Sequence, residues 1–270
     1  MSAPSSGWTV LLGGSGREGM DRGIVRRFVE LAGGPMDARV VIVPTASEQR
    51  KQTIERYQNA FELEDLQRIG VLDIRTRHHA DEPESLRRLR EATGVMFTGG
   101  DQLRLLTILE GTRFADELRQ RGCQEGLVVG GSSAGAMALG DPAIVRGDAK
   151  RFYESGAISL MPGLGLTPGV TVDTHFVARG RLTRLLPVVA EHPETLGLGI
   201  EEGCGVTVSP EGLLTAHGGG VVCIVDGAGA TSAGGALADS CGALSMIGVR
   251  LHVLAAGDCF DLRARRAARP

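Results

Sequence analysis

The 270-residue sequence has little of what marks several large classes of protein. Its five cysteines are scattered and none forms a C-x-x-C pair, which argues against a disulfide framework or a zinc site. No apolar run approaches the ~20 residues of a membrane helix. The first residues, MSAPSSGW, lack the charged and apolar regions of a signal peptide. We therefore expect a cytoplasmic protein with reduced thiols and no membrane contact.

The sequence also lacks an excess of charge of either sign. It has 29 basic and 32 acidic residues, for a formal charge of −3, so nothing in its composition favours nucleic acid as a partner. Aromatic residues are only 4%, but hydrophobic residues reach 42%, which is ordinary for a globular protein with a core. A chain of this length suits one large α/β domain or two small ones. We expect one domain over residues 1–270.

Short apolar runs alternate with amphipathic stretches up to Leu139. This alternation predicts an α/β fold with a mostly parallel sheet and helices on both faces. After Leu139 it breaks: 140–168 reads as irregular, 206–262 as a mainly antiparallel extension on one sheet edge, and 263–270 as a frayed tail. The expected strands are Trp8–Leu12, Arg39–Val43, Gly70–Ile74, Gly94–Thr98 and Leu127–Val129. The expected helices are Arg22–Leu31, Glu48–Ile69 (one longer helix or a pair of helices), Pro83–Glu91, Asp101–Leu109 and Arg113–Arg121.

The most informative stretch is a G-x-S-x-G motif centred on Ser133, between an apolar run and a run of helix formers. A sharp strand-to-helix turn needs glycines beside a strained residue, and it presents that residue's side chain at the sheet edge. The N-terminus of the following helix favours negative charge, so an oxyanion beside Ser133 would be stabilised. The alternative interpretation is an ordinary small-residue turn of a parallel sheet.

A second glycine motif follows the first expected strand. Gly14, Gly16 and Gly19 form a G-x-G-x-x-G, which is typical of dinucleotide-binding proteins. Such sites need an acidic residue at the end of the next strand. Here that strand ends in Pro-Thr-Ala-Ser, and Asp37 precedes it. The pattern therefore favours a glycine-rich turn at the carboxyl edge of the sheet over a cofactor site.

Paired glycines also end the expected fourth strand. The N–H group of Gly100 is a candidate oxyanion donor together with that of Ala134, because glycines let the backbone approach a ligand closely. Gln102 follows, and its amide is placed to meet a substrate. The alternative is a plain Gly-Gly turn in which Asp101 caps the next helix.

Two further stretches carry ionisable groups after apolar runs. His175 is a candidate proton acceptor for a serine, and arginines suited to binding carboxylates follow it. The pair Glu201 and Glu202 ends another run, and one carboxylate of such a pair would orient a histidine. The alternatives are a structural histidine, a solvated helix face and a turn with two solvated acids.

Four stretches together resemble the cyanophycinase (S51) family of serine peptidases. They are FTGGDQ (97–102), GSSAGA (131–136), DTHFVARGRLTRL (173–185) and GIEEG (199–203), in the family's order, and the resemblance runs from Trp8 to about Leu262. It implies a flavodoxin-like, class I glutamine-amidotransferase-like fold. It also implies that Ser133 is the nucleophile, His175 the base and Glu202 the third member of a triad. The residues implied to line the substrate site are Gln102, Asp173, Thr174, Arg179, Arg181 and Arg184.

The resemblance further implies a reaction and its setting. Members hydrolyse the poly-aspartate backbone of cyanophycin, whose β-carboxyls carry arginine, to β-aspartyl-arginine; they need no metal or organic cofactor and are commonly homodimers. Thr174 stands where the family usually has Gln, which affects the specificity carried over. Two alternatives remain: an aspartyl or isoaspartyl dipeptidase of the same family, and a non-catalytic binding protein that keeps the pocket.

Overall fold

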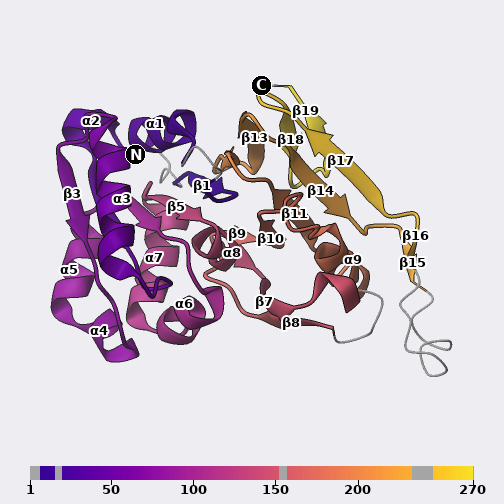
Figure 1. Ribbon diagram of the computed structural model, residues 1–270, viewed down its shortest axis with the longest axis horizontal. Coiled ribbons are helices and arrows are strands. Elements are labelled where there is room, and N and C mark those ends of the chain that lie inside the picture. Colours follow the sequence, from indigo (N-terminus) through magenta and orange to yellow (C-terminus); the bar gives the residue numbers. More distant parts are fainter. Residues whose placement is uncertain (1–6, 16–19, 152–156, 233–245, 270) are drawn as a thin grey trace.

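The computed structural model describes residues 7–15, 20–151, 157–232 and 246–269 (Figure 1). The helices are α1 Arg22–Leu31, α2 Gly34–Asp37, α3 Arg50–Glu62, α4 Arg77–Asp81, α5 Pro83–Glu91, α6 Gln102–Leu109, α7 Arg113–Gln124, α8 Ala134–Leu139 and α9 Leu182–Glu191, with a 3-10 turn at Ala149–Arg151. The strands up to β10 are β1 Thr9–Leu12, β2 Arg39–Val43, β3 Arg68–Val71, β4 Gly94–Phe97, β5 Val128–Ser132, β6 Gly140–Asp141, β7 Ala143–Gly147, β8 Ile158–Met161, β9 Thr167–Pro168 and β10 Val170–Thr174. The later strands are β11 Leu196–Ile200, β12 Cys204–Val208, β13 Leu213–Gly218, β14 Val222–Asp226, β15 Thr231–Ser232, β16 Met246–Ile247, β17 Arg250–Leu254, β18 Cys259–Asp261 and β19 Arg266–Ala268.

The larger sheet has the order β19-β18-β13-β12-β1-β5-β4-β2-β3 in the described part of the chain. Its half from β1 to β3 is entirely parallel, and its half from β12 to β19 is antiparallel. Val10 and Leu12 of β1 pack on one face with α1 and α3, whereas Leu11 packs on the other with α5 to α8. Both faces of the parallel half are therefore covered by helices, which confirms the predicted α/β fold (Figure 1).

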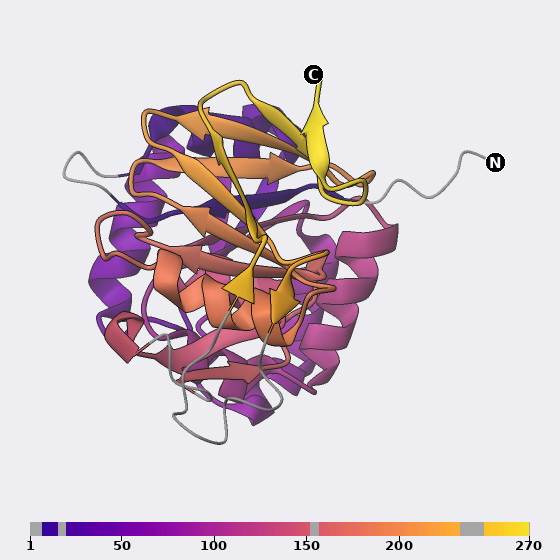
Figure 2. The same cartoon turned by 90° about the vertical axis from the view of Figure 1, so that its right-hand side faces the viewer.

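A second sheet was not predicted. Its order is β17-β14-β11-β10-β6-β9, and α9 packs on it through Leu185, Val188 and Val189. The expected antiparallel extension is divided between the two sheets: β12, β13, β18 and β19 extend the larger sheet, while β14 and β17 join the second one. Figure 2, with its orange and yellow strands toward the viewer, shows this division. The short helix α8 lies against both β5 and β10, and so ties the sheets together.

Three other expectations were wrong. The stretch 140–168 is not irregular throughout, because β6, β7, β8 and β9 lie in it. The stretch Glu48–Ile69 is not helical throughout, because α3 ends at Glu62 and β3 begins at Arg68. The tail is not frayed, since β19 pairs with β18 and the Arg265 guanidinium binds the buried carboxylate of Asp226 at 2.8 Å. A buried carboxylate needs a partner of opposite charge, and this contact holds the tail on the sheet.

Candidate active site

Ser133 occupies the sharp turn between β5 and α8. Its φ of 52° and ψ of −117° are strained for a residue with a side chain. A Cβ at Gly135 would lie 2.5 Å from the Phe97 carbonyl oxygen, and one at Gly131 would lie 2.6 Å from the amide nitrogen of Ala136. Only glycine permits such close packing, so the motif builds the turn that exposes the hydroxyl of Ser133.

Three side chains that are distant in the sequence form a hydrogen-bonded chain. The Oγ of Ser133 lies 2.8 Å from Nε2 of His175, and Nδ1 of the same ring lies 2.6 Å from Oε1 of Glu202. Because an ionised carboxylate only accepts hydrogen bonds, Nδ1 carries the proton and Nε2 is left to accept the Ser133 proton. The arrangement is that of a nucleophile, its base and the base's orienting acid.

The glycines after β1 make room for the histidine. The backbone N–H of His175 donates to the Gly13 carbonyl at 2.9 Å. A Cβ on Gly14 would lie 2.6 Å from Nε2 of His175, so the imidazole lies directly against the backbone there. These two glycines have a packing role at the site. The other glycines of the dinucleotide-type motif, Gly16 and Gly19, lie outside the described residues.

The two predicted oxyanion donors belong to the segments that surround the serine's cavity. Gly100, with φ of 144°, lines the same cavity as Ser133, and Ala134 is the first residue of α8. In the described ranges no backbone carbonyl accepts a hydrogen bond from either amide. Unpaired N–H groups beside a nucleophile can receive the negative charge that develops on a carbonyl oxygen during attack.

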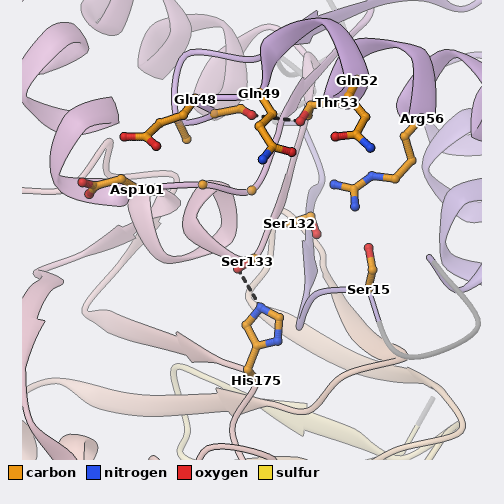
Figure 3. Close-up of a pocket in the computed structure, with 14 residues that line it drawn as sticks. Ser15, Glu48, Gln49, Gln52, Thr53, Arg56, Asp101, Ser132, Ser133 and His175 are labelled. Carbon is orange, nitrogen blue, oxygen red and sulfur yellow. Dashed lines mark hydrogen bonds between the residues drawn. The ribbon is translucent and has the colours of Figure 1, made fainter.

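The hydroxyl of Ser133 opens into a cavity of about 720 Å³, shown in Figure 3. Its floor comes from the ends of β1, β4 and β5, and its far wall is α3 with the loop before it. The polar lining residues that sequence reasoning did not select include Ser15, Ser47, Glu48, Gln49, Gln52, Thr53 and Arg56. Four of these are spaced at i, i+3, i+4 and i+7, which is one helix face; that polar stripe was the available signal.

Comparisons with known proteins agree with this geometry. The sequence matches the profile of peptidase family S51 over residues 9–215. It is 34% identical over 260 residues to a cyanophycinase of Synechococcus elongatus, covering 96% of this chain and 80% of the relative. It is 32% identical over 259 residues to a cyanophycinase of Geminocystis herdmanii, covering 95% and 94%. The chain belongs to peptidase family S51. It is a serine-type peptidase, as the four motifs predicted.

One solved structure shows the fold of this S51 peptidase. A peptidase from an acI-B1 actinobacterium superposes with a TM-score of 0.67 at 20% sequence identity, over 96% of this chain and 98% of that one.

Within the described ranges of the S51 peptidase, no group of three or more His, Cys, Asp or Glu side chains is placed to hold a metal ion. Over the same ranges, no helix is long and apolar enough to cross a membrane.

The residues predicted to line the substrate site do not line this cavity. Gln102 uses its amide to donate to the carbonyls of Ile144 and Val145, at 3.1 and 3.3 Å. Asp173 and Thr174 are fully buried. Gln102 is thus engaged by the backbone of β7 and the other two residues lie in β10, and contact of these three with a substrate stays a prediction. Arg179 is exposed and lies outside the cavity lining.

Two of the arginines are occupied by Asp173. Its carboxylate lies 2.9 Å from Arg181 and 3.1 Å from the buried Arg184. Burial raises the pKa of Asp173 and lowers that of Arg184, and their mutual attraction opposes both changes. The Arg181 guanidinium also donates to the Thr174 carbonyl at 2.9 Å, immediately before His175. The cluster thus fixes the turn that carries His175. Arg181 and Arg184 pair with Asp173 and are not both free to bind a substrate.

Glu201 holds the same turn from its other side. Its carboxylate accepts hydrogen bonds from the backbone N–H groups of Val177 and Ala178. The adjacent Glu202 instead reaches the ring of His175. The two carboxylates therefore point to different groups, which avoids repulsion between them.

Proposed function

We propose that this S51 peptidase is an exopeptidase that hydrolyses the α-peptide backbone of cyanophycin and releases β-aspartyl-arginine. The observation that carries the chemistry is the continuous chain from Ser133 through His175 to Glu202, with contacts of 2.8 and 2.6 Å. The substrate rests on the cyanophycinases to which the sequence is 32–34% identical over nearly its full length.

The proposed mechanism follows from the positions of these groups. Ser133 attacks the carbonyl carbon after an aspartyl unit while Nε2 of His175 takes its proton. Glu202 holds the imidazole and stabilises its charged form. The N–H groups of Gly100 and Ala134 bind the oxyanion. His175 returns the proton to the leaving nitrogen, and water then releases the acyl group by the same steps in reverse order.

The test compares the wild type with Ser133→Ala on purified cyanophycin, with β-aspartyl-arginine followed by mass spectrometry. Release by the wild type alone is expected, with a loss of at least about 10³-fold in the variant. No release by either protein, together with cleavage of short aspartyl peptides, would identify the dipeptidase alternative. Equal release by both would reject Ser133 as the nucleophile.

A fluorophosphonate probe addresses the remaining alternative, a binding protein without catalysis. Labelling of Ser133 in the folded protein requires an activated hydroxyl, so we expect stoichiometric labelling that His175→Ala abolishes. A protein that binds cyanophycin but is not labelled would be a binding protein.

We also propose a homodimer in the cytoplasm. Strand β17 is an edge strand that exposes Leu251 and Val253, and nearby β16 exposes Ile247; these side chains are 49%, 59% and 69% exposed. Such an edge is suited to a second copy of the chain. Four cysteines lie in the described residues and all are free thiols, as a reducing compartment requires. Sedimentation of the wild type against Leu251→Lys tests the dimer.

A further inference from the structure

The charges around the cavity are separated in space. Figure 3 shows the guanidinium of Arg56 on one side, the carboxylates of Glu48 and Asp101 on the other, and Ser133 with His175 between them. Among the described residues that line this cavity, Arg56 is the one arginine or lysine. A neutral or singly charged substrate would not use both poles, so the arrangement indicates a ligand that carries both charges.

Among the described residues, Arg56 has no competing acidic partner. It is exposed, it makes no ion pair with any side chain in the described ranges, and it lies 5.7 Å from the centre of the Tyr57 ring. Arg50, on the same helix, behaves differently because it pairs with Asp73 at 3.4 Å. An unpaired guanidinium above a fixed aromatic ring is ready to bind a carboxylate through two parallel hydrogen bonds.

The opposite pole has free acceptor capacity. Oδ1 of Asp101 caps α6 by accepting from the N–H groups of Leu103 and Arg104, at 2.8 and 3.3 Å. Its second oxygen takes no hydrogen bond from the described residues. Glu48 precedes α3 and is exposed. It has no cationic partner among the residues that the structure describes. Two such carboxylates suit a guanidinium group.

We propose that Arg56 on one side, and Glu48 with Asp101 on the other, bind the substrate's terminal unit and fix its direction in the cavity. Arg56 binds the free α-carboxylate that ends the aspartate backbone, and Glu48 with Asp101 binds the guanidinium of the arginine attached to that unit. The scissile carbonyl then lies at Ser133. This inference rests on the proposed function, because β-aspartyl-arginine is the unit that carries both charges.

The carboxylate pole is tested with a two-unit substrate, prepared with a free terminal α-carboxylate or with the corresponding amide. The wild type is expected to prefer the acid by about 10- to 100-fold in kcat/KM, the range of a charge-assisted hydrogen bond. Arg56→Gln should reduce this preference to under about 3-fold, by lowering the kcat/KM of the acid more than that of the amide. Lys51→Gln, a cation of the same helix outside the cavity lining, should keep the wild-type preference. An unchanged preference in Arg56→Gln would overturn the proposal.

The acidic pole is tested with the same substrate carrying citrulline, which is neutral, in place of arginine. The wild type should prefer arginine by about 10-fold or more, and the double variant Glu48→Gln with Asp101→Asn should lose most of that preference. Asparagine caps a helix as well as aspartate does, so α6 is retained. Equal rates on both substrates in the wild type would overturn this pole.

A binding measurement separates this inference from the proposed function. Calorimetry on Ser133→Ala compares the dipeptide β-aspartyl-arginine with the derivative whose aspartyl α-carboxylate is an amide. This measurement does not depend on turnover. Tighter binding of the acid, lost in Ser133→Ala with Arg56→Gln, supports the reading of the carboxylate even if the wild type cleaves no polymer. Equal binding of acid and amide, or binding of neither, would contradict it.

Discussion

Glu201 and Glu202 are chain neighbours with the same side chain, but only Glu202 contacts the ring of His175. Glu202→Gln replaces a carboxylate oxygen by an NH2 group that can donate to Nδ1 of His175. This favours the tautomer with its proton on Nε2, which cannot accept the Ser133 proton. We expect kcat to fall by about 10³- to 10⁴-fold with little change in KM. Steady-state kinetics on cyanophycin, or on the peptide found to be cleaved, measures this.

Glu201→Gln is the matched control for that change. Its amide oxygen can still accept from the N–H groups of Val177 and Ala178. The loss of kcat should therefore stay under about 10-fold. Similar losses in the two variants would mean that the position of the turn, and not the tautomer of His175, accounts for the effect of Glu202.

At the scale of single residues, sequence reasoning placed Ser133, His175 and Glu202 at strand ends, and the structure brings their side chains into contact. It could not place Asp173, because a carboxylate before a histidine reads equally as a ligand or as a buried anchor. Only the folded chain shows that Arg181 and Arg184 lie within 3.1 Å of it. Arg56 was missed because an exposed arginine on a helix is usually solvated.

At the scale of elements, the loop after β1 is hydrogen-bonded to the loops that carry His175 and Gly203. A Cβ at Gly14 would lie 2.6 Å from Nε2 of His175, and the φ there is 120°. Gly14→Ala should displace the imidazole from Ser133 and lower kcat by about 10²-fold or more, since a misplacement of about 1 Å is that costly. Fluorophosphonate labelling should slow in parallel.

Gly229→Ala is the comparison for backbone strain alone. Gly229 also has a positive φ, 82°, but nothing lies within 4 Å of its ideal Cβ. We expect a loss of stability of about 1 kcal/mol and unchanged kcat. If Gly14→Ala kept full activity, the contact between that loop and His175 would not position the base.

Elements with strong periodicity were predicted well, and those set by tertiary pairing were not. The parallel half of the larger sheet follows from the alternation of apolar runs and amphipathic helices. Strands β10 and β11 read as strands too, but nothing local indicates that they pair with each other in a second sheet. Strand β3, at a sheet edge and half-exposed, lacks the apolar signal that marks a buried strand, so its start was misplaced.

At the scale of the whole molecule, the chain's end is fixed by a buried charge. Asp226 is fully buried and pairs with Arg250 at 2.6 Å and Arg265 at 2.8 Å. Arg265→Met leaves the carboxylate with one cation and frees the carbonyl of Pro193. We expect the free energy of unfolding to fall by about 1–3 kcal/mol, measured by urea denaturation.

Arg266→Met is the matched control, since this neighbour is exposed and has no charged partner in the described part of the chain. It should change the free energy of unfolding by under about 0.5 kcal/mol. A similar loss in both variants would mean that the tail is held by the pairing of β18 with β19, not by the ion pair.

The pairing of β1 with β12 has a consequence for how the protein acquires its activity. It joins Thr9 to Val208, and it sets the loop after β1, which contacts His175, beside the loop before β12, which carries Glu202. Closing so long a loop is entropically slow compared with forming the local parallel units. During refolding, local helices and strands should therefore return first, and the ability to turn over substrate should return last, when β12 pairs with β1.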